Sequence, residues 1–192
     1  AVEIARLRIW LSLIVDENDG KNIQPLPNLD YKIVQGNSLL GFDKFEINTP
    51  SLIQLEKIKS HYFDETSPSK KQKYREQIQH LIRQITNDKN AFDFNVYFSE
   101  IIINKQGFDI VIANPPYIDS EEMTKSQKSL RDNIAKNYQL TKGNWDIYIA
   151  FYERGFKILN TNGSLAFISP DKWIVKSFGY ELRKASLKKL YS

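Results

Sequence analysis

The sequence predicts an α/β fold built on a parallel sheet, for two reasons. Predicted helices and buried strands alternate along the chain, and this order produces parallel strands joined by crossovers. The segment 108–113, FDIVIA, is an apolar run of strand length that only Asp109 interrupts, as is typical of a central strand covered on both faces. We therefore expect ligands to bind at the carboxyl edge of the sheet.

Composition narrows the class of protein. A chain of 192 residues, 41% hydrophobic and 26% charged, can bury a sizeable core. No segment has the roughly 20 apolar residues of a membrane span, and Glu3, Arg6 and Arg8 interrupt the apolar start, so we expect neither a membrane partner nor a signal peptide. Cysteine is absent and there are 2 His, which argues against a metal site. The net charge of +4 permits a nucleic-acid partner without requiring one.

The first half of the chain is predicted to be mainly helical. It opens in a helix with apolar residues around most of its circumference, which we expect to be buried on more than one side. Residues 31–35, YKIVQ, form a short strand that leads into the turn GNSLL. Helices at 49–63 and 67–87 each begin with Thr or Ser followed by Pro, and they form a hairpin that occupies 49–90. The cations at the start of its second helix are expected to face solvent rather than DNA: Lys70, Lys71, Lys73 and Arg75.

The second half is predicted to complete the sheet. Residues 119–140 contain helical stretches, and a longer helix covers 143–159. A second buried strand follows at 164–170, then a helix at 178–187. The last residues, 188–192, are expected to begin a further strand.

The motif NPPY, at residues 114–117, directly follows the strand 108–113. These four residues in this order occur by chance in about one chain of this size in a thousand. Pro115 and Pro116 stiffen the backbone and lack N–H donors, which leaves the Asn114 side-chain oxygen and the carbonyl groups of Asn114 and Pro115 as acceptors beside the Tyr117 ring. Acceptors beside a flat ring suit a planar group that carries an amine, although a rigid surface turn would explain the motif too.

FDIVIANPPYI resembles motif IV of the amino-methyltransferases that use S-adenosylmethionine. KIVQGNSLL is similar to motif III of that group, and AVEIARLRIWLSL to the helix after motif II. KGNWDIYIAFYERGFKIL and GSLAFISPDKWIVKSFGYELR resemble the segments after motif IV in large N6-adenine DNA methyltransferases, the fused methyltransferase–nucleases of type IIG restriction–modification. This resemblance covers nearly the whole chain. It implies a truncated Rossmann-like S-adenosylmethionine-dependent methyltransferase fold in which the hairpin is an insertion.

The resemblance also implies a function. It is that of a site-specific DNA methyltransferase that transfers a methyl group from S-adenosylmethionine to adenine N6, within a restriction–modification or phage-defence enzyme of the bacterial or archaeal cytoplasm. The partner would be double-stranded DNA with a flipped adenine, because N6 is inaccessible inside the stack. The implied catalytic residues are Asn114, Pro115, Pro116 and Tyr117. The Asn114 side chain and the Pro115 carbonyl would accept hydrogen bonds from N6, and Tyr117 would stack on the base.

Further residues receive expected roles from the same resemblance. Asn37 would accept from the adenine amine of the cofactor, with Ser38 and Asn114 beside it, although Asn37 also suits a plain turn. Lys172 would contact DNA, while Trp173 is as well explained by packing. We expect Asp146, at the start of its helix, to be a capping carboxylate rather than a catalytic one.

Two features of that family are missing from the sequence. No F-x-G-x-G turn precedes residue 31, and the acidic residue of motif II would lie just before Ala1. The DNA-recognition region is absent as well, and no capping residue precedes the first helix. We therefore expect residues 1–192 to be part of a methyltransferase catalytic domain, inactive by itself, from a longer protein to which a nuclease and a recognition domain can be fused.

Two other functions remain open. NPPY also occurs in methyltransferases that act on protein glutamine or on RNA bases, but these usually have a short connection between GNSLL and NPPY, where this chain carries the hairpin. A non-catalytic subunit that keeps a methyltransferase fold would explain the missing glycine turn, although the intact NPPY argues against it.

Overall fold

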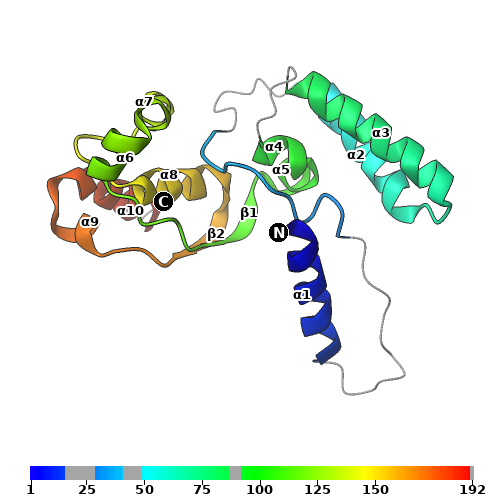
Figure 1. Ribbon diagram of the computed structural model, residues 1–192, viewed down its shortest axis with the longest axis horizontal. Helices are drawn as coiled ribbons and strands as arrows, with labels where there is room; N and C mark the ends of the chain where they lie inside the picture. The colour runs from blue at the N-terminus through cyan, green and yellow to red at the C-terminus, as the bar shows by residue number, and fades with distance from the viewer. Residues whose placement is uncertain (16–28, 41–48, 87–91, 191–192) are drawn as a thin grey trace. The chain divides into compact units, whose positions relative to one another are not determined.

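A computed structural model describes residues 1–15, 29–40, 49–86 and 92–190, which fall into two compact units (Figure 1). The first unit comprises residues 1–37 and 45–99, and the second comprises 38–44 and 100–192. Each unit has its own hydrophobic core.

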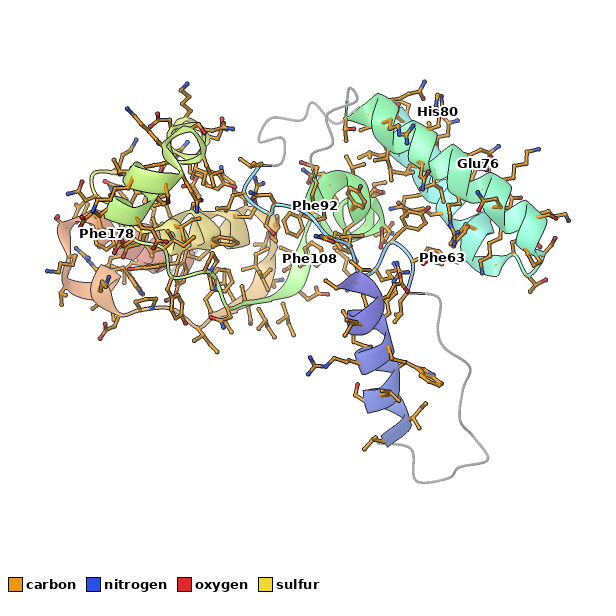
Figure 2. The ribbon with its side chains drawn as sticks, in the orientation of Figure 1. Phe63, Glu76, His80, Phe92, Phe108 and Phe178 are labelled. Atoms are coloured by element: carbon orange, nitrogen blue, oxygen red, sulfur yellow. The ribbon has the colours of Figure 1, made fainter. Side chains whose placement is uncertain are left out.

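The first unit is helical. It contains α1 (Val2–Val15), α2 (Thr49–Asp64), α3 (Pro68–Ile85) and the short α4 (Phe94–Tyr97). The predicted hairpin is confirmed, since α2 and α3 lie side by side, while Glu76 and His80 are exposed on the outer side of α3 (Figure 2). The buried residues of its core are Leu52, Leu55, Tyr62, Ile78, Leu81, Ile82 and Val96.

The start of α3 shows a capping arrangement that the sequence did not indicate. Ser67 occupies the N-cap position, but its side chain makes no capping hydrogen bond. Instead the carboxylate of Glu65 accepts from the backbone N–H groups of Thr66 and Ser67, at 3.0 and 2.8 Å. These bonds lower the pKa of Glu65, the bond from Ser67 contributing most. The hairpin turn is therefore fixed by an acid that precedes the helix.

Two predictions for the first unit are wrong. The helix α1 was expected to be buried on more than one side, but within the described residues many of its apolar side chains are exposed: Ile4, Leu7, Ile9, Leu11 and Val15. Residues 31–35 form no strand, and 31–33 make a turn instead. The Leu29 carbonyl accepts from the N–H groups of Lys32 and Ile33, and Tyr31 has a positive φ of 63°, which breaks the extended backbone.

The second unit contains the predicted parallel strand pair. Strand β1 (Phe108–Ala113) pairs with β2 (Leu159–Phe167), with Ile110 opposite Ser164 and Ala113 opposite Phe167. Three helices connect the strands: α6 (Ser120–Ser126), α7 (Lys128–Asn137) and α8 (Ile147–Ile158). The α5 helix (Ser99–Lys105) leads into β1, and the chain after β2 forms α9 (Lys172–Val175), η1 (Ser177–Gly179) and α10 (Tyr180–Leu190).

The two faces of this sheet differ. On one face, Gly155 of α8 approaches β2 so closely that a Cβ there would lie 2.5 Å from the Leu165 side chain. On the other face, Ile110 and Ile112 are 64% and 77% exposed. The prediction that β1 is covered on both faces is therefore wrong for the part of the chain that the structure describes.

Several boundaries in the second unit also differ from prediction. Helix α8 begins at Ile147 rather than at residue 143, after Gly143 adopts a positive φ of 68°. The strand β2 spans Leu159–Phe167 rather than the predicted 164–170. The expected strand at 188–192 is wrong for residues 188–190, which continue α10, while 191–192 lie outside the described residues. None of the helices in the described ranges is both long and apolar enough to cross a membrane.

Candidate active site

The NPPY motif lies at the carboxyl end of β1, as predicted. Asn114 follows the last residue of the strand, and the Ile168 N–H donates to the Ala113 carbonyl at 3.1 Å, so the parallel pairing continues to this point. Both strands therefore end at the same edge of the sheet. Pro115 is buried, while Asn114, Pro116 and Tyr117 are exposed at this edge.

The polar groups of the motif meet each other. The Tyr117 hydroxyl lies 3.1 Å from the Asn114 Oδ1 and 3.3 Å from the Ile168 carbonyl oxygen, so its single hydrogen can be donated to either acceptor. The Tyr117 side chain is 56% exposed, which leaves ring surface open to a ligand. Because an amide oxygen has two lone pairs, the Asn114 Oδ1 can accept from a second donor while this bond persists.

The segment after the motif is tied to the start of α8. The Ile118 carbonyl accepts from the Ile147 N–H at 3.0 Å, and the Ser120 N–H donates to the Asp146 Oδ1 at 3.2 Å. Asp146 occupies the N-cap position of α8, yet its side chain makes no capping bond within that helix. The expected position at the helix start is confirmed, but the expected capping bond is not made, because the carboxylate accepts from the first residue of α6 instead. This pairing fixes the exit of the chain just beyond Tyr117.

Asp146 also faces two side chains. It is 5% exposed, and its Oδ2 lies 3.6 Å from the Lys172 Nζ. Burial, followed by the Asp146 charge, raises the pKa of the neighbouring Tyr148, so this phenol stays neutral. Lys172 is thus placed beside the start of α8, to which the chain just after the motif is bonded, with half of its side chain open to solvent.

Trp173 proves to be a packing residue. Its ring lies 5.7 Å from the Tyr152 ring, and it packs against the core of the second unit. The Tyr152 hydroxyl pairs with the Ser169 hydroxyl at 2.9 Å, which links α8 to the chain after β2. These contacts set the direction in which residues 169–173 leave the sheet.

The expected cofactor residues Asn37 and Ser38 lie in a turn. Asn37 is exposed and ends the first unit, whereas Ser38 is half-buried and opens the second. Gly36 just before them approaches Phe92 so closely that a Cβ there would lie 2.0 Å from the Phe92 Cβ. The turn therefore requires glycine, but the strand expected before it is absent. Within the second unit, the structure brings Asn114 and Tyr117 together.

The sequence did not predict a charged cluster in the first unit. The Asp30 carboxylate pairs with Arg6 at 2.9 Å and Arg75 at 3.3 Å, and it accepts from the Tyr62 hydroxyl. The cluster borders a cavity of about 460 Å³, in which burial, followed by the Tyr62 charge, raises the pKa of Tyr31 to about 12. Glu3 also pairs with Arg6 at 2.9 Å, so two arginines face two acids, and the cluster joins α1, α2 and α3 rather than forming a charged site. No group of three or more His, Cys, Asp or Glu able to hold a metal occurs among the described residues.

Comparison with known proteins identifies the family. The family model of the Eco57I restriction–modification methylases matches residues 1–191 of this chain. The chain belongs to this family. The resemblance inferred from the motifs is thereby confirmed, and a methyltransferase-type α/β fold agrees with the helices and parallel strands of the second unit.

Individual relatives agree with this assignment. The type II restriction enzyme and methyltransferase RM.Eco57I of Escherichia coli is 34% identical over 77 residues, or 40% of this chain and 8% of the relative. The type II methyltransferase M.PaeR7I of Pseudomonas aeruginosa is 37% identical over 76 residues, or 40% of this chain and 13% of the relative. RM.MjaORFECS2P of Methanocaldococcus jannaschii, a putative type II restriction enzyme and methyltransferase, is 24% identical over 274 aligned residues, or 98% of this chain and 22% of the relative.

The matches thus span between 8% and 22% of the length of these curated relatives. No solved structure matches the chain.

Proposed function

We propose that this protein is a site-specific DNA methyltransferase that transfers a methyl group from S-adenosylmethionine to the N6 atom of adenine, within a restriction–modification or phage-defence enzyme. The observation that carries the proposal is the NPPY turn at the shared carboxyl edge of β1 and β2, where the Tyr117 hydroxyl and the Asn114 Oδ1 are 3.1 Å apart beside an open ring surface. Family membership and the names of the relatives support the reaction class.

The chemistry follows from the acceptors of the motif. Adenine N6 is a weak nucleophile because its lone pair is delocalised into the ring. Acceptance of both amine hydrogens, by the Asn114 Oδ1 and the Pro115 carbonyl, favours a more tetrahedral nitrogen and stabilises the charge that develops on it. Tyr117 stacks on the flipped base and holds N6 in line with the methyl group. No strong base is required for this step.

The described residues fit part of the cofactor. S-adenosylmethionine supplies an electrophilic methyl group when it is bound. Asn114 is exposed at the strand edge, as a residue near that methyl group must be, and the exposed Asn37 carries an amide able to accept from an adenine amine. With Ser38, these residues would hold the adenine end and the methyl side. The contacts to the methionine and ribose would come from other segments.

A methylation assay tests the proposal. The full-length protein is incubated with duplex DNA, RNA and protein substrates and with cofactor that carries a tritiated methyl group, and the labelled DNA is digested to nucleosides. We expect the label in N6-methyladenine of duplex DNA. Label in cytosine, RNA or protein glutamine would reject the adenine proposal, and no label in any substrate would favour the non-catalytic alternative.

A further inference from the structure

The positive charge of this protein is concentrated at one end of the chain. Residues 171–192 contain six Lys and Arg and two Asp and Glu, which equals the net charge of +4 of the whole sequence. Residues 1–170 are therefore formally neutral. A local excess of this kind is the electrostatic signature of a surface that binds a polyanion.

The structure shows four of these cations exposed within one continuous segment. Lys184 and Lys188 are exposed one turn apart on α10, a spacing that aligns them on the same helix face, and Leu182 of the same helix is fully buried in the core of the second unit. Lys172 and Lys176 are exposed at the two ends of α9, which packs against η1 and α10. Lys184 and Lys188 thus face solvent from a helix that the core holds in place.

Two aliphatic side chains lie exposed between these lysines. Ile174 and Val175 are 55% and 79% exposed, although they stand between Lys172 and Lys176 in sequence. The aromatic residues on either side, Trp173 and Phe178, pack against the core instead. Trp173 and Phe178 thus pack inward, while Ile174 and Val175 remain open to solvent.

Contacts to the backbone of this segment fix the exposed positions of Ile174 and Val175. The Arg183 Nη1 donates to the carbonyl groups of Trp173 and Lys176, the latter at 3.0 Å. Gly179 approaches the Trp173 backbone so closely that a Cβ would lie 1.9 Å from the Trp173 carbonyl oxygen. These contacts hold α9 and η1 against the start of α10, so the surface is preorganised for a partner.

This surface lies within reach of the candidate active site. The Tyr117 hydroxyl contacts the Ile168 carbonyl, and Lys172 follows four positions later. Four residues span at most about 14 Å. Since base pairs repeat every 3.4 Å or so along each strand, Lys172 can reach a phosphate within about four base pairs of a nucleotide held at Tyr117.

We propose that these residues form a face that binds the DNA duplex beside the flipped adenine; we call it the basic face, and it consists of Lys172, Ile174, Val175, Lys176, Lys184 and Lys188. The lysines contact backbone phosphates, and the aliphatic pair lies against the sugars and base edges of a groove. This proposal rests on the proposed function and adds the surface that positions the substrate.

Salt-dependent binding tests the charged part of the proposal. The triple variant Lys176→Gln, Lys184→Gln, Lys188→Gln of the full-length protein is compared with a hairpin variant of equal charge change, Lys57→Gln, Lys70→Gln, Lys73→Gln. Each phosphate contact contributes roughly 0.9 to the slope of log affinity against log salt concentration. The slope of the first variant should therefore be smaller by about 2.7, and this variant should bind a short duplex up to about 500-fold more weakly at 0.1 M salt. The hairpin variant should keep the original slope and affinity.

The aliphatic pair gives an independent readout. Ile174→Ser with Val175→Ser should weaken duplex binding roughly tenfold, because apolar contact area is lost, while the slope against salt stays unchanged. Equal slopes for the basic-face and hairpin variants would overturn the proposal, whether the face then binds an acidic protein or nothing. If the wild-type protein methylates adenine in DNA but these variants bind duplex normally, the basic face fails and the proposed function stands. If no DNA is methylated at all, the proposed function itself fails.

Discussion

Replacement of Tyr117 separates the role of its ring from the role of its hydroxyl. The hydroxyl contacts the Asn114 Oδ1 at 3.1 Å and the Ile168 carbonyl at 3.3 Å, in a position open to solvent. A solvent-exposed bond of this kind contributes toward the lower end of the range of about 0.5–1.5 kcal/mol for a hydrogen bond. Tyr117→Phe should therefore lower the methylation rate only about two- to threefold, which is the effect of slightly looser positioning of Asn114.

Removal of the ring should cost much more. A base stacked on an aromatic side chain gains about 1–3 kcal/mol, so Tyr117→Ala should weaken capture of the flipped adenine by roughly 5- to 150-fold. The assay places 2-aminopurine at the target adenine and measures its fluorescence on binding, together with the single-turnover methylation rate on unmodified duplex. The reasoning is refuted if the phenylalanine variant is as impaired as the alanine variant, or if the 2-aminopurine fluorescence on binding is the same for both variants as for wild type.

Three further predictions follow from the same contacts. Asp146→Ala should destabilise the second unit by about 1–3 kcal/mol, because the Ser120 N–H loses its acceptor; Asp146→Asn, which keeps an acceptor oxygen, should be milder, and chemical denaturation measures both. Gly179→Ala should lower the thermal stability by about 1–3 kcal/mol because its Cβ would meet the Trp173 backbone, whereas the neighbouring exposed Ser177→Ala should change it by less than about 0.5 kcal/mol. Calorimetric titration of residues 1–192 with S-adenosylmethionine should give a dissociation constant of about 1 mM or weaker, since contacts worth about 1.5–3 kcal/mol each are missing without a glycine turn; micromolar binding would contradict this.

Local signals account for the elements that the sequence predicted well. The hairpin helices α2 and α3 have apolar residues at helical spacing and a Pro near each start, and these features act within a few residues. The predicted bounds of β1, 108–113, are confirmed, because a continuous apolar run between Gly107 and the prolines favours a strand of this length. The position of NPPY followed directly from that strand.

The incorrect predictions involve information that is not local. Residues 31–35 include apolar side chains, but the positive φ of Tyr31 and the hydrogen bonds to the Leu29 carbonyl produce a turn. The apolar run of β1 indicates cover on both faces, yet it cannot say which segments provide that cover, and Ile112 is 77% exposed. The start of β2 at Leu159 depends on pairing with Phe108, a partner far away in the sequence.

The candidate site shows the same division between features set by local sequence and features set by distant contacts. The residue types at 114–117 indicated acceptors beside a ring, and the structure confirms that Asn114 and Tyr117 meet. The bond of the Tyr117 hydroxyl to Asn114 and the approach of Lys172 to Asp146 depend on side-chain directions and on the return of the chain after β2. Neither is encoded in a short motif.

The most direct test of the central claim is the single-turnover rate of adenine methylation by the full-length protein with Asn114→Ala, measured beside its affinity for S-adenosylmethionine. Loss of one preorganised acceptor aimed at N6 costs on the order of 3 kcal/mol, so we predict a rate at least about a hundredfold below that of wild type, with the cofactor affinity mostly intact and partial recovery in Asn114→Asp. If the alanine and aspartate variants methylate DNA as fast as wild type, residues 114–117 are not the site at which the adenine amine is held.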